Sequence, residues 1–145
     1  MKTPSIALAE TDSEILRCYP VLLQLRPHLK EKEFLPRVRA MRKESYRLAF
    51  LTDHENTVRS VAGYRTLNLL FSGKTLYVDD LVTDSAVRSH GYGDHLIDWL
   101  VARARAENFD EFSLDSGTQR VDAHRFYLRK RMKISCFHFS LPLKP

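Results

Sequence analysis

Two closely spaced glycines, Gly91 and Gly93, stand in a polar turn that joins an apolar run to an amphipathic helix. Glycine has no Cβ, so its backbone can approach a ligand closely, and the first N–H groups of a helix have no partner within that helix. These groups and the positive end of the helix dipole favour an anion. The turn Arg88-Ser89-His90-Gly91-Tyr92-Gly93-Asp94 therefore predicts an anion-binding site of the kind that holds phosphate.

Three other chemical motifs fail on their spacing. Gly73-Lys74-Thr75 resembles the end of a nucleotide-binding P-loop, but Asn68 stands where the first glycine should be, and a strand is expected to follow. A dinucleotide fingerprint would need a third glycine where the chain has Leu96. His90 and His95 are not spaced to share one helix face, so no metal site is predicted.

The elements that must position the glycine turn follow from apolar periodicity, which predicts a mixed α/β chain. Strands are expected over residues 5–9, 46–52, 58–70, 74–83, 109–115 and 134–141. Helices are expected from the capping box at 11–14, over 30–45, from the glycine turn to about residue 104, and over 119–131. Turn signals at 53–56 and 72–73 favour an antiparallel meander. Pro20 is expected to kink or split the first helix.

Length and composition set the protein class. The chain has 145 residues, 43% of them hydrophobic, and no linker or repeat divides it, so one domain over 1–145 is expected. Neither a signal-peptide core nor a membrane-length apolar run is found, which favours a cytoplasmic protein. Cys18 and Cys136 are far apart and are expected to be free, buried thiols. The net charge is +5, with an acidic middle (77–116) between basic flanks.

The order of these features resembles one known family. The chain resembles the GNAT superfamily of acyl-coenzyme A dependent N-acetyltransferases in five successive features. They are a strand ending in Asp80-Leu81-Val82-Thr83, the turn Arg88-x-x-Gly91-x-Gly93, a helix, a strand, and a helix carrying Phe126-Tyr127. Its signature reads Gln/Arg-x-x-Gly-x-Gly/Ala. The resemblance implies a single-domain α+β fold, with a mostly antiparallel mixed sheet of six to seven strands, splayed at the centre and flanked by about four helices.

The resemblance also implies how acetyl-coenzyme A would bind. In the family, the strand matching 74–83 carries a bulge and splays from the strand matching 109–115, so the pantetheine arm pairs with exposed main-chain groups. Here those groups would belong to Leu81, Val82 and Thr83. The pyrophosphate would lie on the N–H groups of the turn, which makes the remaining cofactor-binding residues Arg88, Ser89, His90, Gly91, Tyr92, Gly93 and Asp94.

Tyr127 matches the family tyrosine that lies near the cofactor sulfur. A phenol with an ordinary pKa of about 10 stays protonated at neutral pH and can donate a proton to the departing thiolate. The resemblance therefore implies direct attack of an amine on the acetyl group in a ternary complex, with Tyr127 as the general acid. A main-chain N–H such as that of Val82 could polarise the thioester carbonyl. The other interpretation of Tyr127 is an ordinary core residue of an amphipathic helix.

The candidate bases are the adjacent carboxylates Asp79 and Asp80. Their side chains would face opposite sides of a regular strand, so just one would reach the acceptor unless a bulge alters the alternation. Some family members carry a glutamate base earlier on this strand, where this chain has Tyr77. Either aspartate, acting directly or through water, or no dedicated base is compatible with the pattern, and Asp80 is favoured. Asp80 could equally anchor the substrate ammonium or hold a sheet hydrogen bond.

Two further departures from the family concern glycine positions. Arg131 stands where the family often has a glycine after the tyrosine helix, which implies a different helix exit. Ser89 replaces a frequent glycine within the phosphate turn, where its hydroxyl could add a donor.

The acceptor is expected to be a small-molecule or peptide amine whose identity the sequence leaves open. It would enter near residues 25–34 and 134–141, where the aromatic and acidic side chains suit a cationic amine; these are Glu31, Glu33, Phe34, Phe137 and His138. No membrane partner is expected, nucleic acid is disfavoured, and a homodimer stays open. The alternatives are a catalytically silent acetyl-coenzyme A sensor, or a basic nucleic-acid or partner-binding module that uses the segment 120–133.

Overall fold

Residues 4–145 are described by the structure, a computed structural model, and the chain forms two compact units, Met1–Ser113 and Leu114–Pro145. The strands in this range are β1 (Ser5–Leu8), β2 (Arg47–Thr52), β3 (Val58–Leu69), β4 (Gly73–Thr83) and β5 (Glu111–Leu114). The helices are α1 (Asp12–Leu25), α2 (Glu31–Arg42), α3 (Tyr92–Ala106) and α4 (Val121–Arg129), with a 3-10 turn, η1 (Ser85–Val87).

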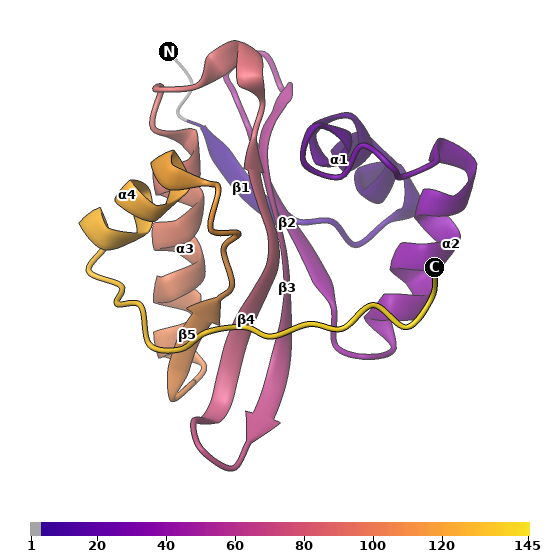
Figure 1. The fold of residues 1–145 in the computed structure, drawn as a ribbon. Coiled ribbons are helices and arrows are strands. Elements are labelled where there is room, and N and C mark those ends of the chain that lie inside the picture. The colour runs from indigo at the N-terminus through magenta and orange to yellow at the C-terminus, as the bar shows by residue number, and fades with distance from the viewer. Residues whose placement is uncertain (1–3) are drawn as a thin grey trace. The chain divides into compact units, whose positions relative to one another are not determined.

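One sheet with the strand order β1-β2-β3-β4-β5 organises the first unit. The first four strands pair antiparallel in sequence order, which confirms the meander expected from the turn signals. Within the described residues, the ladder of paired residues runs from β1 to β4. β5 joins β4 near the start of that strand, where the Asp110 N–H donates to the Lys74 carbonyl at 2.7 Å. In Figure 1, α1 and α2 cover one face of this sheet and α3 covers the other.

The α+β class is confirmed, but residues 4–145 contain five strands where six to seven were expected. The missing strand is the closing one predicted over 134–141. This segment has no regular structure, and its apolar side chains are exposed: Ile134 by 78%, Phe137 by 84% and Phe139 by 90%. The prediction of a strand there was wrong because alternation indicates a strand only when the apolar face packs against a partner, and this face packs against none of the described residues.

α1 shows how local sequence starts a helix and how packing extends it. Thr11 is the N-cap, and its side chain and that of Glu14 form the expected capping box. The helix continues through Pro20, so of the expected kink or split, the split does not occur. Pro20 lies on the exposed side, where water can satisfy the carbonyl group that loses its partner, while the buried residues Ile15 and Leu22 hold both halves against the sheet.

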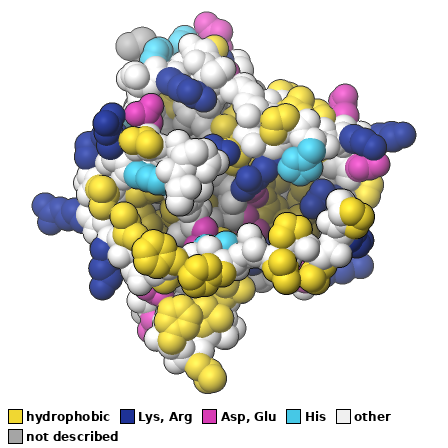
Figure 2. All heavy atoms as spheres, viewed as in Figure 1, with side chains coloured by type: hydrophobic (Ala, Val, Ile, Leu, Met, Phe, Trp, Pro, Cys, Tyr) yellow, Lys and Arg dark blue, Asp and Glu magenta, His cyan; other side chains and the backbone are white. Residues whose placement is uncertain are grey.

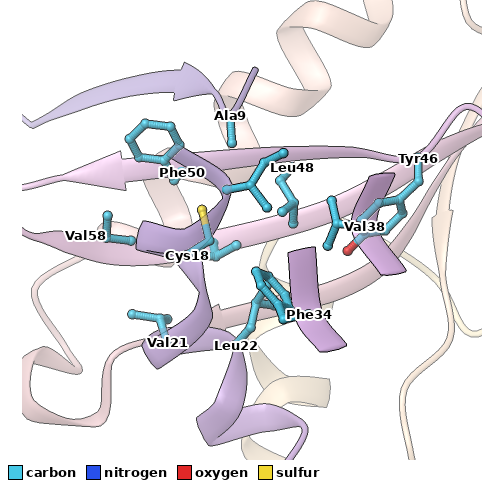
Figure 3. Packing of buried hydrophobic residues seen from close by; sticks show 12 residues of the cluster. Ala9, Cys18, Val21, Leu22, Phe34, Val38, Tyr46, Leu48, Phe50 and Val58 are labelled. Carbon is cyan, nitrogen blue, oxygen red and sulfur yellow. The ribbon is translucent and has the colours of Figure 1, made fainter. Parts of the chain in front are cut away.

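The core of the first unit lies between α1, α2 and the sheet (Figure 3). Phe34 and Val38 of α2 and Leu22 of α1 pack toward Leu48 of β2. Burial raises the pKa of the Cys18 thiol in this cluster to about 12. The expectation of buried thiols holds for Cys18 and is wrong for Cys136, which is exposed in the irregular C-terminal segment.

No helix among the described residues is long and apolar enough to cross a membrane.

Candidate active site

A β-bulge in β4 separates the two candidate bases. Gly63 of β3 pairs with Asp80, whereas the next residue, Tyr64, pairs with Val78, so Asp79 is the additional residue on β4. A bulge of this kind changes the side-chain alternation and bends the strand. The bulge expected from the family resemblance is therefore present, and it lies at the two aspartates.

Asp80 is held by two groups that lie far from it in sequence. Its Oδ1 accepts a hydrogen bond from Arg26 Nε at 2.9 Å, and its Oδ2 accepts one from the Tyr46 hydroxyl at 2.7 Å. Burial, followed by the negative charge of Asp80, raises the pKa of Tyr46 well above its ordinary value. The Tyr46 phenol therefore stays protonated and acts as a donor to Asp80.

Gly63 makes this hydrogen bond sterically feasible. A Cβ at position 63 would overlap the Tyr46 hydroxyl and would lie 2.8 Å from Asp80 Oδ2. Because Gly63 is the strand partner of Asp80, only the smallest residue leaves room for both side chains.

Asp79 has a different environment from Asp80. Arg65 forms a fork on its carboxylate, with Nη2 donating to Oδ2 at 2.6 Å and Nε lying 3.0 Å from both oxygens. The hydrogen bond with Asp79 raises the pKa of Arg65. A bidentate charged pair of this kind fixes the orientation of the Asp79 carboxylate.

A pocket of about 240 Å³ opens beside Asp80. Its apolar wall comes from the α1 and α2 residues Leu22, Phe34 and Val38, together with Tyr46. Its basic groups are Arg26, His28 and Arg37. Figure 2 shows basic side chains and a histidine gathered over α1 and α2. Of the residues predicted to lie near the acceptor, Phe34 lines this pocket. Glu31 and Glu33 are exposed and do not line it.

The glycine turn follows β4 and η1 and contains two residues with positive φ. Ser89 and Gly91 have left-handed backbones, with φ of 72° and 79°. Gly91 is the N-cap of α3, and no side chain caps the helix, so its first N–H groups are available to a ligand. Arg88, exposed at this turn, has no hydrogen-bond or ion-pair partner among residues 4–145.

The end of β4 and the glycine turn lie against each other. A Cβ at Gly93 would come within 3.0 Å of Thr83 Oγ1, so the packing there favours glycine. Leu81, Val82 and Thr83 are half-buried, and their strand partners in the described chain all lie on β3. The structure thus brings together the two predicted halves of the cofactor site in the first unit.

Asp84 anchors the start of this turn. Its Oδ1 accepts a hydrogen bond from the Ala86 N–H, and its Oδ2 accepts one from Arg59 Nη1 at 2.9 Å. These bonds lower the pKa of Asp84, the backbone bond from Ala86 most strongly. The chain between β4 and the glycines is therefore fixed to β3 by a carboxylate that stays ionised.

Tyr127 lies in the second unit, on α4, and is half-buried. Burial raises its pKa, an effect partly opposed by the Arg120 charge. In the same unit, the Ser116 hydroxyl oxygen is buried and has no hydrogen-bond partner among the described residues. Arg131, which replaces a frequent family glycine, adopts the left-handed backbone that glycine favours, with φ of 66°.

A sequence model described as the acetyltransferase (GNAT) family matches residues 8–132, most of the chain and parts of both units. The chain belongs to the GNAT acetyltransferase family. This GNAT chain is 41% identical over 114 residues to YhdJ, an uncharacterized N-acetyltransferase of Bacillus subtilis, with 77% of this chain and 79% of YhdJ covered. It is also 35% identical over 66 residues to an aminoalkylphosphonate N-acetyltransferase of Salmonella typhimurium, with 46% and 43% covered.

Solved structures agree on the fold. A ribosomal-protein-alanine N-acetyltransferase of Brucella melitensis superimposes with a TM-score of 0.83 at 14% identity, covering 98% of this chain and 100% of the other. Among residues 4–145 of this GNAT protein, no group of three or more His, Cys, Asp or Glu side chains is arranged to hold a metal ion.

Sequence reasoning missed three residues of this site: Arg26, Tyr46 and Gly63. Nothing in their local sequence marks them, because Arg26 lies 54 residues from Asp80 and Tyr46 lies 34 residues from it. The one available signal was the glycine in the middle of a strand, since such a residue often marks a bulge or a close approach.

Proposed function

We propose that this protein transfers an acetyl group from acetyl-coenzyme A to a primary amine by direct attack in a ternary complex. The observation that carries the proposal is the arrangement on β4. Asp80 lies beside a pocket open to an acceptor, and the same strand continues into an uncapped glycine turn suited to a pyrophosphate. By its name, the Salmonella relative acts on a small amine, an aminoalkylphosphonate, and the small pocket here suits an acceptor of similar size.

Acetyl-coenzyme A, when bound, supplies a thioester whose acetyl group is open to nucleophilic attack. The main-chain groups of Leu81–Thr83 would bind the pantetheine arm, and the residues from Arg88 to Asp94 would bind the pyrophosphate. Gly91 suits this role because its surroundings are open: a Cβ there would meet only His95, at 3.9 Å.

Asp80 is the residue to which we assign the base role. A primary amine is mostly protonated at neutral pH and must lose a proton before it can attack. Each Asp80 oxygen already accepts one hydrogen bond and has a further lone pair, so the carboxylate can take that proton directly or through water. Asp79 would serve instead as a structural partner of Arg65.

Tyr127 is the residue to which we assign the acid role. As the N–C bond forms and the C–S bond breaks, the departing sulfur needs a proton, and the phenol can supply it. Burial raises the pKa of Tyr127, which keeps the proton on its oxygen at neutral pH. The proposal also includes the expectation from the sequence that residues 1–145 form one N-acetyltransferase domain.

Calorimetry with acetyl-coenzyme A tests the cofactor assignment. We expect binding of the whole cofactor and much weaker binding of S-acetylpantetheine, which lacks the pyrophosphate. Gly91→Val should weaken the binding of acetyl-coenzyme A, because valine does not tolerate φ of 79°. The absence of any binding to the wild-type chain would refute the proposed function.

Thiol release with a panel of primary amines tests the transfer itself. Tyr127→Phe should lower kcat while the affinity for acetyl-coenzyme A stays nearly unchanged, because only the proton donor is removed. Unchanged turnover in this variant would remove Tyr127 as the acid. Binding of acetyl-coenzyme A with no turnover across the panel would favour a silent sensor on the same fold.

A further inference from the structure

The pocket beside Asp80 has a charge arrangement that an acceptor carrying only an amine does not explain. Asp80 already pairs with Arg26, so the positive charges of Arg37 and, when protonated, His28 are left without a compensating carboxylate in the pocket. Neither the Arg37 side chain nor the His28 side chain has a hydrogen-bond or ion-pair partner among residues 4–145.

The polar groups of the pocket also differ in depth. The Asp80 side chain is 15% exposed and the Arg26 side chain is 40% exposed, while Arg37 and His28 are exposed residues. The single carboxylate therefore lies deepest, and the basic groups lie toward solvent. Leu22, Phe34 and Val38 form an apolar wall of the same pocket.

We propose that the acceptor is a small primary amine that also bears an anionic group, either a carboxylate or a phosphate or phosphonate. This inference rests on the proposed function. The amine would lie at Asp80, and the anion would lie at the mouth of the pocket, paired with Arg37 and His28. Arg26 adds a further donor there, because it uses Nε on Asp80 and Nη2 on the Asp79 carbonyl while its Nη1 makes no hydrogen bond within the described chain.

The size of the pocket limits the acceptor further. A volume of about 240 Å³ is below the range of roughly 300–1,000 Å³ that is usual for pockets of drug-sized ligands. A compact molecule with its two charged groups a few bonds apart fits this space. Arg37 is the specificity-determining residue in this arrangement, because a guanidinium binds carboxylate and phosphate oxygens in pairs.

Matched two-carbon amines test the inference. Thiol release from acetyl-coenzyme A is measured with O-phosphoethanolamine and β-alanine as anionic amines, ethanolamine as the neutral amine and 1,2-diaminoethane as the cationic amine. We expect kcat/KM for at least one anionic amine to exceed that for ethanolamine by roughly tenfold or more. The two anionic amines separate phosphate from carboxylate recognition.

Variants of α2 give the second readout. Arg37→Gln should raise KM for the anionic amines roughly tenfold or more above any change in the KM of ethanolamine, and Arg37→Lys should restore part of the loss. Lys32→Gln is the matched control, because it removes the same charge from an exposed position of α2 that does not line the pocket. It should change neither KM.

Different experimental outcomes would overturn the anionic-amine acceptor and the acetyltransferase function. Efficient turnover of ethanolamine or 1,2-diaminoethane in preference to the anionic amines, or an equal effect of Arg37→Gln on all of them, would overturn the inference and leave the acetyltransferase function intact. Calorimetry of O-phosphoethanolamine and β-alanine, with coenzyme A present, decides the case in which no amine is turned over. Binding that Arg37→Gln abolishes supports the inference, and the absence of binding overturns it.

Discussion

Asp80 and Asp79 are chemically identical and adjacent, yet the structure gives them different environments. Asp80 meets a phenol and one guanidinium nitrogen at the edge of a pocket, whereas Asp79 is held by the fork of Arg65. The bulge at Asp79 produces this difference, because it changes the direction in which the strand presents its side chains. Individual substitutions at these two positions should therefore have distinct effects.

Asp80→Asn should lower kcat with a productive amine by about a hundredfold or more, the usual contribution of a general base. The affinity for acetyl-coenzyme A should stay nearly the same, since the proposed cofactor contacts are made elsewhere. Steady-state kinetics and calorimetry measure the two effects. Asp79→Asn is the matched comparison, and an equal loss of kcat in both variants would contradict the assignment of Asp80 as the base.

Gly63→Ala tests the packing around the Tyr46–Asp80 hydrogen bond. The added Cβ would overlap the Tyr46 hydroxyl, so the variant should lose about 1–3 kcal/mol of unfolding free energy and a large part of kcat. Urea unfolding and turnover measure these losses. Gly117→Ala serves as a control, because the three heavy atoms nearest to its Cβ would all belong to the end of the flexible Gln119 side chain. Wild-type stability and turnover in Gly63→Ala would show that the hydrogen bond is not needed.

The β2–β3 hairpin and the start of the glycine turn are joined through one arginine. Arg59 on β3 donates through Nε to Asp53 Oδ2 at 2.7 Å, and through Nη1 to Asp84 at the end of β4. Asp53 Oδ1 also accepts the N–H groups of Glu55 and Thr57, which closes the hairpin turn. This network connects the two hairpin strands to the segment that leads into the proposed phosphate site.

The hairpin network predicts a loss of stability in acid. The hydrogen bond from Arg59, with those from Thr57 and Glu55, lowers the pKa of Asp53 from 3.8 to about 2. A carboxyl group with a lowered folded-state pKa stabilises the fold above the unfolded-state pKa, and this stability is lost as the pH falls from about 4 toward 2. Denaturant unfolding across that range should show the decline.

Asp53→Asn should make the same pH dependence shallower, because the amide does not titrate, and it should be less stable than the wild type at pH 7. An equally steep acid transition in this variant would assign the decline to other carboxylates.

The chain as a whole separates a packed first unit from an exposed C-terminal segment. The buried hydrophobic residues all lie between positions 9 and 104, whereas Phe137, Phe139, Leu141 and Leu143 are 80–90% exposed. Exposed apolar side chains in a row favour association between molecules. The stability of the protein should therefore depend little on this segment, while its solubility should depend on it.

Deletion of residues 134–145 should change the free energy of unfolding by less than about 1 kcal/mol, because the removed side chains bury little surface. It should also reduce light scattering at high protein concentration. Urea unfolding and static light scattering measure the two effects. A loss of several kcal/mol on deletion would show that the segment packs against a partner in solution.

The sequence alone was sufficient for most of the elements. The four helices, five of the six expected strands and the glycine turn were predicted because each depends on local patterns: apolar periodicity, a capping box, and turn residues at hairpin spacing. The wrong prediction of a strand at 134–141 also has a local cause. The alternation there was interpreted without a partner strand, so the prediction did not include tertiary packing.

The contacts that distinguish the two aspartates of the candidate site are visible only in the tertiary structure. The glycine turn and the two aspartates could be found in the sequence, but their division of roles follows from a one-residue bulge and from Arg26, Tyr46 and Arg65, which come from three other parts of the chain. The pocket that suggests an anionic amine likewise exists only where α1, α2 and β4 meet. Local sequence therefore determined where the glycine turn lies, and only the folded chain gave the two aspartates different environments, because those environments depend on contacts between residues far apart in sequence.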